Sequence, residues 1–261
     1  MRGLVAVDVA VSTLARAVHS GVYGEPAADA LMALIRMLAT LQDDAGDVAV
    51  AGLAKDTMDW PAVTELRFRA DAGVLPSVQS IGTESIERRL YGKPSINVVG
   101  LDGVPPMGKA TNALSPKATA RVSMRLAPSQ DPGTACTLLA SHLRQLAPWG
   151  VTVEITPAGE GSGFSARTGG AYFTAARNAI KTAYGADAVA HTGQGGPIPL
   201  VHAFQVVNHQ ADIVLWGREE PRSAIHGPNE SVSYRELESM AFAEALPLQE
   251  ISQNPNLPRR Q

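Results

Sequence analysis

The sequence predicts an α/β protein whose first part is a compact α+β unit of βαββαβ type, with helices on one face of an antiparallel sheet. The clearest evidence is residues 116–126, where apolar and polar side chains alternate as they do in a half-buried strand. The segments before residue 156 read in the order strand, helix, two strands, helix, strand. Five glycines over residues 157–170 then mark a composition change that is typical of a domain boundary.

The other elements of this first unit follow from their apolar spacing and their start signals. Pro26 precedes a run with helical periodicity, and Pro132 suits the first turn of a second helix, because proline is tolerated where no intrahelical N–H bond is needed. The predicted elements are strands at residues 4–11, 95–101 and 151–155, and helices at residues 27–41 and 131–146.

The remaining segments are less regular. They predict helices at residues 56–69, 171–184 and 232–245, and a strand at residues 211–216. A glycine-rich turn occupies residues 192–199, where Gly195 and Gly196 would let the backbone approach a ligand closely. The last residues are polar and rich in proline, so residues 251–261 are expected to form a frayed tail.

Composition excludes several classes of protein. The chain is 45% hydrophobic and 18% charged, which is ordinary for a globular protein. Its net charge is −3, so it lacks the excess of positive charge that is typical of proteins that bind nucleic acid. Cys136 is the one cysteine, so no intrachain disulfide is possible and a reducing compartment fits. No apolar run is long enough to cross a bilayer, so neither a membrane nor a nucleic acid is expected as a partner. The expected location is the cytoplasm.

Five segments, taken together and in order, resemble one family of enzymes. This family is the zinc-dependent dipeptidase and deacylase family that includes carnosinases, succinyl-diaminopimelate desuccinylase and aminoacylase. The segments are residues 18–24 (VHSGVYG), 93–98 (KPSINV), 116–132 (PKATARVSMRLAPSQDP), 195–199 (GGPIP) and 226–230 (HGPNE). Their order fits the carnosinase-like dipeptidase branch, and the resemblance covers about residues 2–246.

The resemblance implies a domain organisation and a set of partners. Residues 1–158 would be the lid, or peptidase dimerisation domain, and residues 159–250 the C-terminal part of an α/β metallopeptidase catalytic domain. The complete family enzyme holds two zinc ions, hydrolyses a dipeptide or an N-acyl amino acid, and forms a homodimer through its lid.

The resemblance also implies roles for two histidines. His226 resembles the last metal ligand, since a neutral imidazole suits zinc, although by itself it could be a histidine in a polar loop. His19 resembles the catalytic lid histidine that donates a hydrogen bond to the developing oxyanion across the dimer. The alternative for His19 is a loop residue that caps the following helix.

Substrate-binding roles are implied for four further residues. Arg125 resembles the arginine that pairs with the substrate's C-terminal carboxylate, a role suited to a planar bidentate donor, but it could instead form a cross-strand pair on the sheet surface. Asn112 matches a lid position that binds substrate, or it is a turn-forming asparagine. Gly195 and Gly196 would bring the backbone against the substrate, where Pro197 replaces the serine common in the family.

The family's other metal ligands and its base are not found in this sequence. They would lie before the lid, in a His-x-Asp motif, a bridging Asp, a Glu-Glu pair and a further Asp. None of the six histidines stands in a His-x-Asp triplet. One ligand does not hold zinc tightly, so these residues by themselves are expected to be inactive. The alternative is a non-catalytic dimerisation or peptide-binding module.

Overall fold

The computed structural model describes residues 1–217, 223–225 and 227–253 of the 261-residue chain. The chain divides into two compact units. The first unit comprises residues 1–60, 79–164 and 193–199, and the second comprises residues 61–78, 165–192 and 200–261. Each unit is therefore assembled from segments that are far apart in the sequence.

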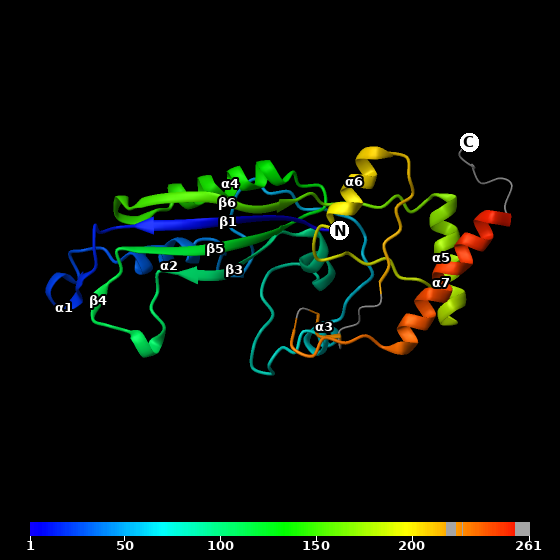
Figure 1. The fold of residues 1–261 in the computed structure, drawn as a ribbon, viewed down its shortest axis with the longest axis horizontal. Coiled ribbons are helices and arrows are strands. Elements are labelled where there is room, and N and C mark those ends of the chain that lie inside the picture. The colour runs from blue at the N-terminus through cyan, green and yellow to red at the C-terminus, as the bar shows by residue number, and fades with distance from the viewer. Residues whose placement is uncertain (218–222, 226, 254–261) are drawn as a thin grey trace. The chain divides into compact units, whose positions relative to one another are not determined.

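The first unit is built on a four-stranded antiparallel sheet in the order β3-β5-β1-β6 (Figure 1). The strands are β1 (Gly3–Ser12), β3 (Ser95–Asp102), β5 (Lys117–Leu126) and β6 (Thr152–Gly161). The central strands β1 and β5 pair along their whole length, from Gly3 opposite Leu126 to Ser12 opposite Lys117. The mixed α/β architecture with a small antiparallel sheet confirms the predicted fold class.

Two helices, α2 (Ala30–Ala39) and α4 (Pro132–Gln145), cover one face of this sheet (Figure 1). The apolar positions of the two central strands face these helices and are almost fully buried, as their alternation predicts. The side chains at the centre of this core are Val5, Val7, Val9, Val11, Leu34, Met37, Val122, Met124, Leu126, Leu139 and Leu143.

Both helices begin at an aspartate that caps the first turn. Asp29 accepts hydrogen bonds from the N–H of Met32 at 2.9 Å and from the N–H of Ser115 at 2.7 Å, so it fixes α2 to the segment before β5. Asp131 accepts from the N–H of Thr134 at 2.7 Å. Because Asp29 takes the cap position, α2 starts at residue 30, three residues later than predicted.

A small second sheet lies at the far end of the first unit, beyond the ends of β1 and β5 (Figure 1). It pairs β2 (Val18–His19) with β4 (Ala113–Leu114), and β2 leads directly into the four-residue helix α1 (Ser20–Tyr23). Three single turns complete the unit, at Arg88–Gly92, Met107–Lys109 and Pro148–Gly150.

The second unit is helical in the residues that the structure describes. Its helices are α3 (Glu65–Asp71), α5 (Ala171–Tyr184), α6 (Pro199–Val207) and α7 (Tyr234–Gln253). α5 and α7 pack against each other, and the hydroxyl of Tyr184 donates to Glu236 at 2.8 Å. Partial burial of the Tyr184 hydroxyl and its bond to Glu236 raise the pKa of Tyr184 to about 12.

Three sequence predictions for these segments are wrong. The helix predicted at residues 56–69 begins only at Glu65 and ends at Asp71, as α3. Residues 211–216 form no strand, because within the described residues no neighbouring strand offers them a hydrogen-bonding edge. α7 runs eight residues beyond its predicted end at residue 245, continues through Pro247 and includes residues 251–253 of the predicted tail. Residues 254–261 lie outside the described part.

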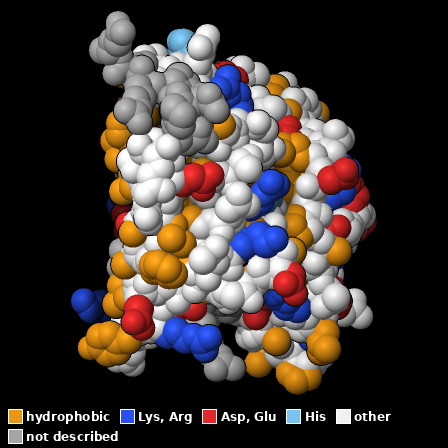
Figure 2. Space-filling model, turned by 90° about the vertical axis from the view of Figure 1, so that its right-hand side faces the viewer, with side chains coloured by type: hydrophobic (Ala, Val, Ile, Leu, Met, Phe, Trp, Pro, Cys, Tyr) orange, Lys and Arg blue, Asp and Glu red, His pale blue; other side chains and the backbone are white. Residues whose placement is uncertain are grey.

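The surface mixes side chains of both charges. On the face shown in Figure 2, Lys and Arg side chains alternate with Asp and Glu, and neither sign forms a continuous patch. Within the described residues, no helix combines the length and the apolar character needed to cross a membrane.

Candidate active-site residues

Residues 193–197, here called the glycine loop, belong to the 193–199 segment of the first unit, although the chain before and after that segment belongs to the second unit. The backbone N–H of Arg2 donates to the carbonyl of Gln194 at 2.9 Å. A Cβ at Gly193 would overlap the ring of Tyr91, and a Cβ at Gly161, the last residue of β6, would lie 2.5 Å from Pro197. Glycine is therefore required at both contacts, because any side chain would push the loop away.

Arg125 lies beside this loop, near the end of β5 and on the sheet face that the helices leave open. A Cβ added to Gly196 would lie 2.5 Å from Nη1 of Arg125, so the guanidinium is packed against the Gly196 backbone. Its strand neighbours are Leu4 and Ser95, neither of which is acidic. Within the described residues, Arg125 forms no ion pair.

Arg121, four residues earlier on the same face of β5, has a different environment. Its Nε and Nη2 donate to the two carboxylate oxygens of Asp8 at 2.7 and 2.8 Å. This bidentate pair lowers the pKa of Asp8 and raises the pKa of Arg121. The cross-strand pair that was the alternative for Arg125 is therefore formed by Arg121, while Arg125 has no acidic partner among the described residues.

His19 and Asn112 are brought together at the small second sheet. His19 pairs with Ala113, and the N–H of Ser20 donates to the carbonyl of Asn112 at 2.9 Å. Both side chains are exposed. Nδ1 of His19 accepts a hydrogen bond from the N–H of Gly21 at 3.0 Å. A neutral ring that accepts at Nδ1 carries its proton on Nε2, so His19 both caps α1 and presents an N–H donor to its surroundings.

The two groups of candidate residues lie at opposite ends of the sheet. Lys117 and Arg125 are eight residues apart on β5, which corresponds to about 26 Å at the usual rise of a strand. His19 and Asn112 lie beyond the Lys117 end, and the glycine loop lies at the Arg125 end. One small substrate therefore cannot contact Arg125 and His19 of the same chain.

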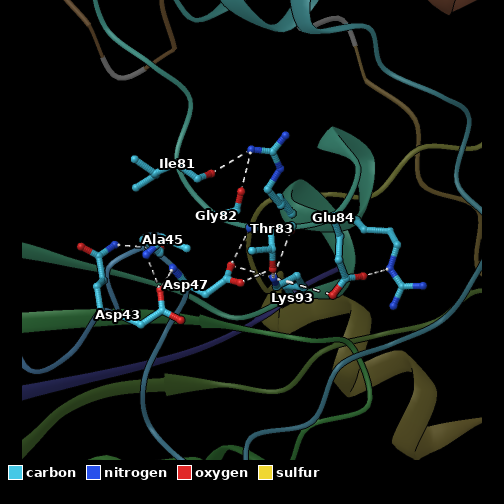
Figure 3. A network of polar contacts seen from close by, with 12 residues as sticks. Asp43, Ala45, Asp47, Ile81, Gly82, Thr83, Glu84 and Lys93 are labelled. Atoms are coloured by element: carbon cyan, nitrogen blue, oxygen red, sulfur yellow. Dashed lines mark hydrogen bonds and ion pairs between the residues drawn. The ribbon is translucent and has the colours of Figure 1, made fainter.

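A buried lysine fixes the segment that leads into β3. Nζ of Lys93, whose side chain is 4% exposed, donates to Asp47 at 2.6 Å and to the carbonyl and hydroxyl of Thr83 at 3.1 and 3.0 Å (Figure 3). Glu84 lies 3.7 Å away. Burial would raise the pKa of Asp47, but the hydrogen bonds from Lys93 and Thr83 outweigh it and lower the pKa to about 2.

The sequence-predicted metal ligand, His226, lies outside the described residues. Among the residues that the structure does describe, no three His, Cys, Asp or Glu side chains are grouped so that they could hold a metal ion. The donor set of the described residues therefore does not by itself fit a metal site.

Comparison with known proteins gives matches along nearly the whole chain. A family model described as "Peptidase dimerisation domain" matches residues 2–151. The cysteinylglycine-S-conjugate dipeptidase of Corynebacterium striatum is 34% identical over 249 residues, which are 94% of this chain and 54% of that protein. The Cys-Gly metallodipeptidase DUG1 of Saccharomyces cerevisiae is 26% identical, over 91% of this chain and 51% of its own length.

Solved structures show the same fold. A structure of the dipeptidase Dug1p from Saccharomyces cerevisiae superposes with a TM-score of 0.84 at 20% identity, covering 98% of this chain and 55% of that chain. Human carnosine dipeptidase 1 superposes with a TM-score of 0.80 at 20% identity, covering 95% and 55%. The chain thus spans about half the length of the relatives it matches.

Proposed function

This chain belongs to the M20 peptidase family, and we propose that it contributes the lid and part of the catalytic domain to a metal-dependent dipeptidase. The lid would be residues 1–158 and the catalytic part residues 159–250. By analogy with the two curated relatives, the substrate would be a dipeptide of the cysteinylglycine type. The single cysteine is consistent with a reducing compartment such as the cytoplasm.

The observation that carries this proposal is the setting of Arg125. Its guanidinium lies against the Gly196 backbone and has no acidic partner among the described residues. A half-buried guanidinium without a counter-ion favours an anion, and its planar fork matches the two oxygens of a carboxylate. We therefore assign Arg125, with Gly195 and Gly196, to the C-terminal carboxylate of the substrate.

The separation of the two candidate groups supports a site shared between two copies. His19 and Asn112 are about 26 Å or more from Arg125 along β5, farther than a dipeptide reaches. In a homodimer formed through the lid, His19 Nε2–H and the Asn112 amide of one copy would contact substrate held by Arg125 of the other. A preorganised N–H donor at the developing oxyanion would contribute about 3 kcal/mol to transition-state stabilisation.

The edge strand β3 is the surface best suited to the dimer. It exposes Val98, Val99 and Leu101, which are 43%, 61% and 57% exposed, next to an unpaired strand edge. α2 is the helix above this side of the sheet. It contacts β5, the strand beside β3, and its Ile35 is 46% exposed.

Sedimentation velocity of the purified chain tests this dimer. We expect a dimer at micromolar concentration that Val99→Lys converts to a monomer, because a lysine on the strand edge would be desolvated on pairing. The matched control is Thr152→Lys, which places the same charge on the opposite edge strand and should leave the dimer intact. A monomeric parent chain, or equal effects of the two lysines, would refute this interface.

The metal centre is proposed on the family resemblance alone. Two zinc ions, with His226 as one ligand, would activate the attacking water in the complete enzyme. The described residues do not themselves fit a metal, so their part is to bind and orient the substrate. We propose that these 261 residues alone hydrolyse no dipeptide. Turnover of cysteinylglycine by the pure chain with added Zn²⁺, abolished by a chelator, would overturn this.

Carboxylate binding can be measured without turnover. In an NMR titration of the ¹⁵N-labelled chain, cysteinylglycine should bind, and its C-terminal amide should bind at least about tenfold more weakly, because a charge-assisted contact is lost. Arg125→Met should abolish this discrimination. Arg121→Met, on the same strand and face but paired with Asp8, should retain it. Equal binding of acid and amide by the parent chain would exclude Arg125 as the carboxylate site.

A second candidate function is a non-catalytic dimerisation or peptide-binding module. The exposed apolar edge of β3 and the family model's description favour it. A dimer that binds neither cysteinylglycine nor its amide would support dimerisation alone, whereas discrimination through Arg125 would support the dipeptidase assignment.

A further inference from the structure

Arg2 is a buried cation at the junction of three segments of the first unit. The residue is only 6% exposed. Its Nη1 donates to the carbonyl of Leu90 at 3.0 Å, and its Nη2 donates to the carbonyl of Lys93 at 2.6 Å and to Oγ of Ser95 at 3.1 Å. The side chain therefore joins the start of β1 to the turn at Arg88–Gly92 and to the first residue of β3.

The backbone of the same residue holds the glycine loop. Its N–H donates to the carbonyl of Gln194, as described above, at 2.9 Å. The next residues of the loop carry the Gly196 backbone against the Arg125 guanidinium. The backbone of residue 2 thus links the glycine loop to β1, and the Arg2 guanidinium, together with the neighbouring contacts of Met1 and Gly3, fixes this segment on the first unit.

The charge of Arg2 is not neutralised by a carboxylate within the described residues. Burial, together with the smaller effect of the nearby positive charge of Arg125, lowers the pKa of Arg2 to about 10. Its Nε is buried and has no hydrogen-bond partner in the part of the chain that the structure describes. A buried cation with only neutral acceptors is costly to maintain, and an apolar side chain of similar size would fill this space at lower cost.

We propose that Arg2 is a positioning residue for the carboxylate site: it fixes the glycine loop against Arg125, and its uncompensated charge strengthens the attraction of that site for an anion. The inference rests on the proposed role of Arg125. It adds a residue that makes no contact with the substrate and whose contacts are to carbonyl and hydroxyl groups of the protein itself. Its effect is therefore on the geometry and the electrostatics of the site.

The test compares four variants of the full chain by amide hydrogen exchange and by titration with cysteinylglycine. Arg2→Met removes the charge and the hydrogen-bond donors. Arg2→Lys keeps the charge but loses the planar guanidinium, whose two amino groups donate to separate carbonyls. Ser95→Ala removes one acceptor only, and remains informative if Arg2→Met does not fold. Arg121→Met is the matched control, since it removes an exposed arginine that is paired on the same sheet.

The backbone N–H of residue 2 reports loop docking, because it is the donor to Gln194 and exists in every variant. In Arg2→Met we expect this amide to exchange at least about tenfold faster and cysteinylglycine to bind at least about tenfold more weakly. Arg2→Lys should restore part of the affinity but not the protection of the amide. Arg121→Met should change neither, and Ser95→Ala should show a smaller acceleration of exchange.

The outcomes separate this inference from the proposed function. If Arg125→Met loses carboxylate discrimination while Arg2→Met keeps both its amide protection and its affinity, Arg2 has no positioning role and the Arg125 site stands. If the parent chain shows no discrimination, the Arg125 assignment fails. Unchanged exchange of the residue-2 amide in Arg2→Met and Ser95→Ala would then also overturn the positioning of the loop by Arg2.

Discussion

Replacing Lys93 by methionine should destabilise the first unit by about 3 kcal/mol. The Lys93 side chain is 4% exposed, and its ammonium donates to Asp47 and twice to Thr83. Removing one partner of a buried ion pair typically costs about 3–5 kcal/mol, because the other charge stays buried without compensation. We take the lower end, because the Asp47 side chain is 17% exposed and keeps the hydrogen bonds from Thr83.

Urea unfolding followed by tryptophan fluorescence measures this loss. In a Trp216→Phe background, the remaining tryptophans Trp60 and Trp149 both belong to the first unit, so the signal reports that unit. With a slope of about 2 kcal/mol per molar urea for a unit of this size, the midpoint should fall by about 1.5 M. The matched control, Lys117→Met, removes an exposed lysine and should shift it by less than about 0.3 M.

A double-mutant cycle separates the ion pair from the loss of packing. Adding Asp47→Asn to Lys93→Met should recover about 1–2 kcal/mol, because the uncompensated carboxylate is removed. Two outcomes would refute the reasoning. One is a midpoint for Lys93→Met within error of the Lys117→Met control. The other is strict additivity of the Asp47 and Lys93 substitutions, which would show that the pair does not act as a unit.

Three further outcomes are expected. Asp47 has a folded-state pKa of about 2, below its unfolded value of about 4. Its contribution to stability is therefore complete above about pH 4 and is lost as the pH falls toward about 2. Between pH 5 and pH 3, the urea midpoint should fall more in the parent chain than in Lys93→Met. Asp29→Ala leaves two backbone N–H donors unpaired and should cost about 2 kcal/mol in the same unfolding assay. Gly161→Ala should undock the glycine loop and cost about 1–3 kcal/mol, because its Cβ would overlap that loop, whereas Gly108→Ala has open space and should be near neutral.

The sheet and its helices were predictable because their signals are local. The alternation over residues 116–126 assigns one face of β5 to the core without knowledge of any partner strand, and Ala118, Val122 and Met124 are fully buried as a result. The predicted start of α2 was less accurate. Pro26 indicated a start at residue 27, whereas the helix begins at Ala30, after the cap residue Asp29.

The strand predicted at residues 211–216 failed for the opposite reason. An apolar β-branched run favours an extended chain, but a strand also needs a neighbour to bond with, and the described residues supply none. Local pattern cannot report whether a neighbour is present.

The site residues were recognised only through ordered motifs, and the residues that support them were missed. Arg2 bonds to carbonyls and a hydroxyl 88 to 93 residues further along the chain, and nothing in its local sequence distinguishes it from a surface arginine. Lys93 lies in a recognised motif, but its burial depends on Asp47 and Thr83 from two separate loops. Such long-range acceptors become visible only in the folded chain.

The interleaving of the two units has a mechanical consequence. The polypeptide passes from one unit to the other after residues 60, 78, 164, 192 and 199. Any relative movement of the units must therefore be absorbed by five tethers at once, and a protease that cuts a single tether would leave both units joined. The glycine loop lies between the last two of these crossings. Its contacts with the first unit would therefore bear part of any force that the second unit exerts on the chain at residues 192 and 199.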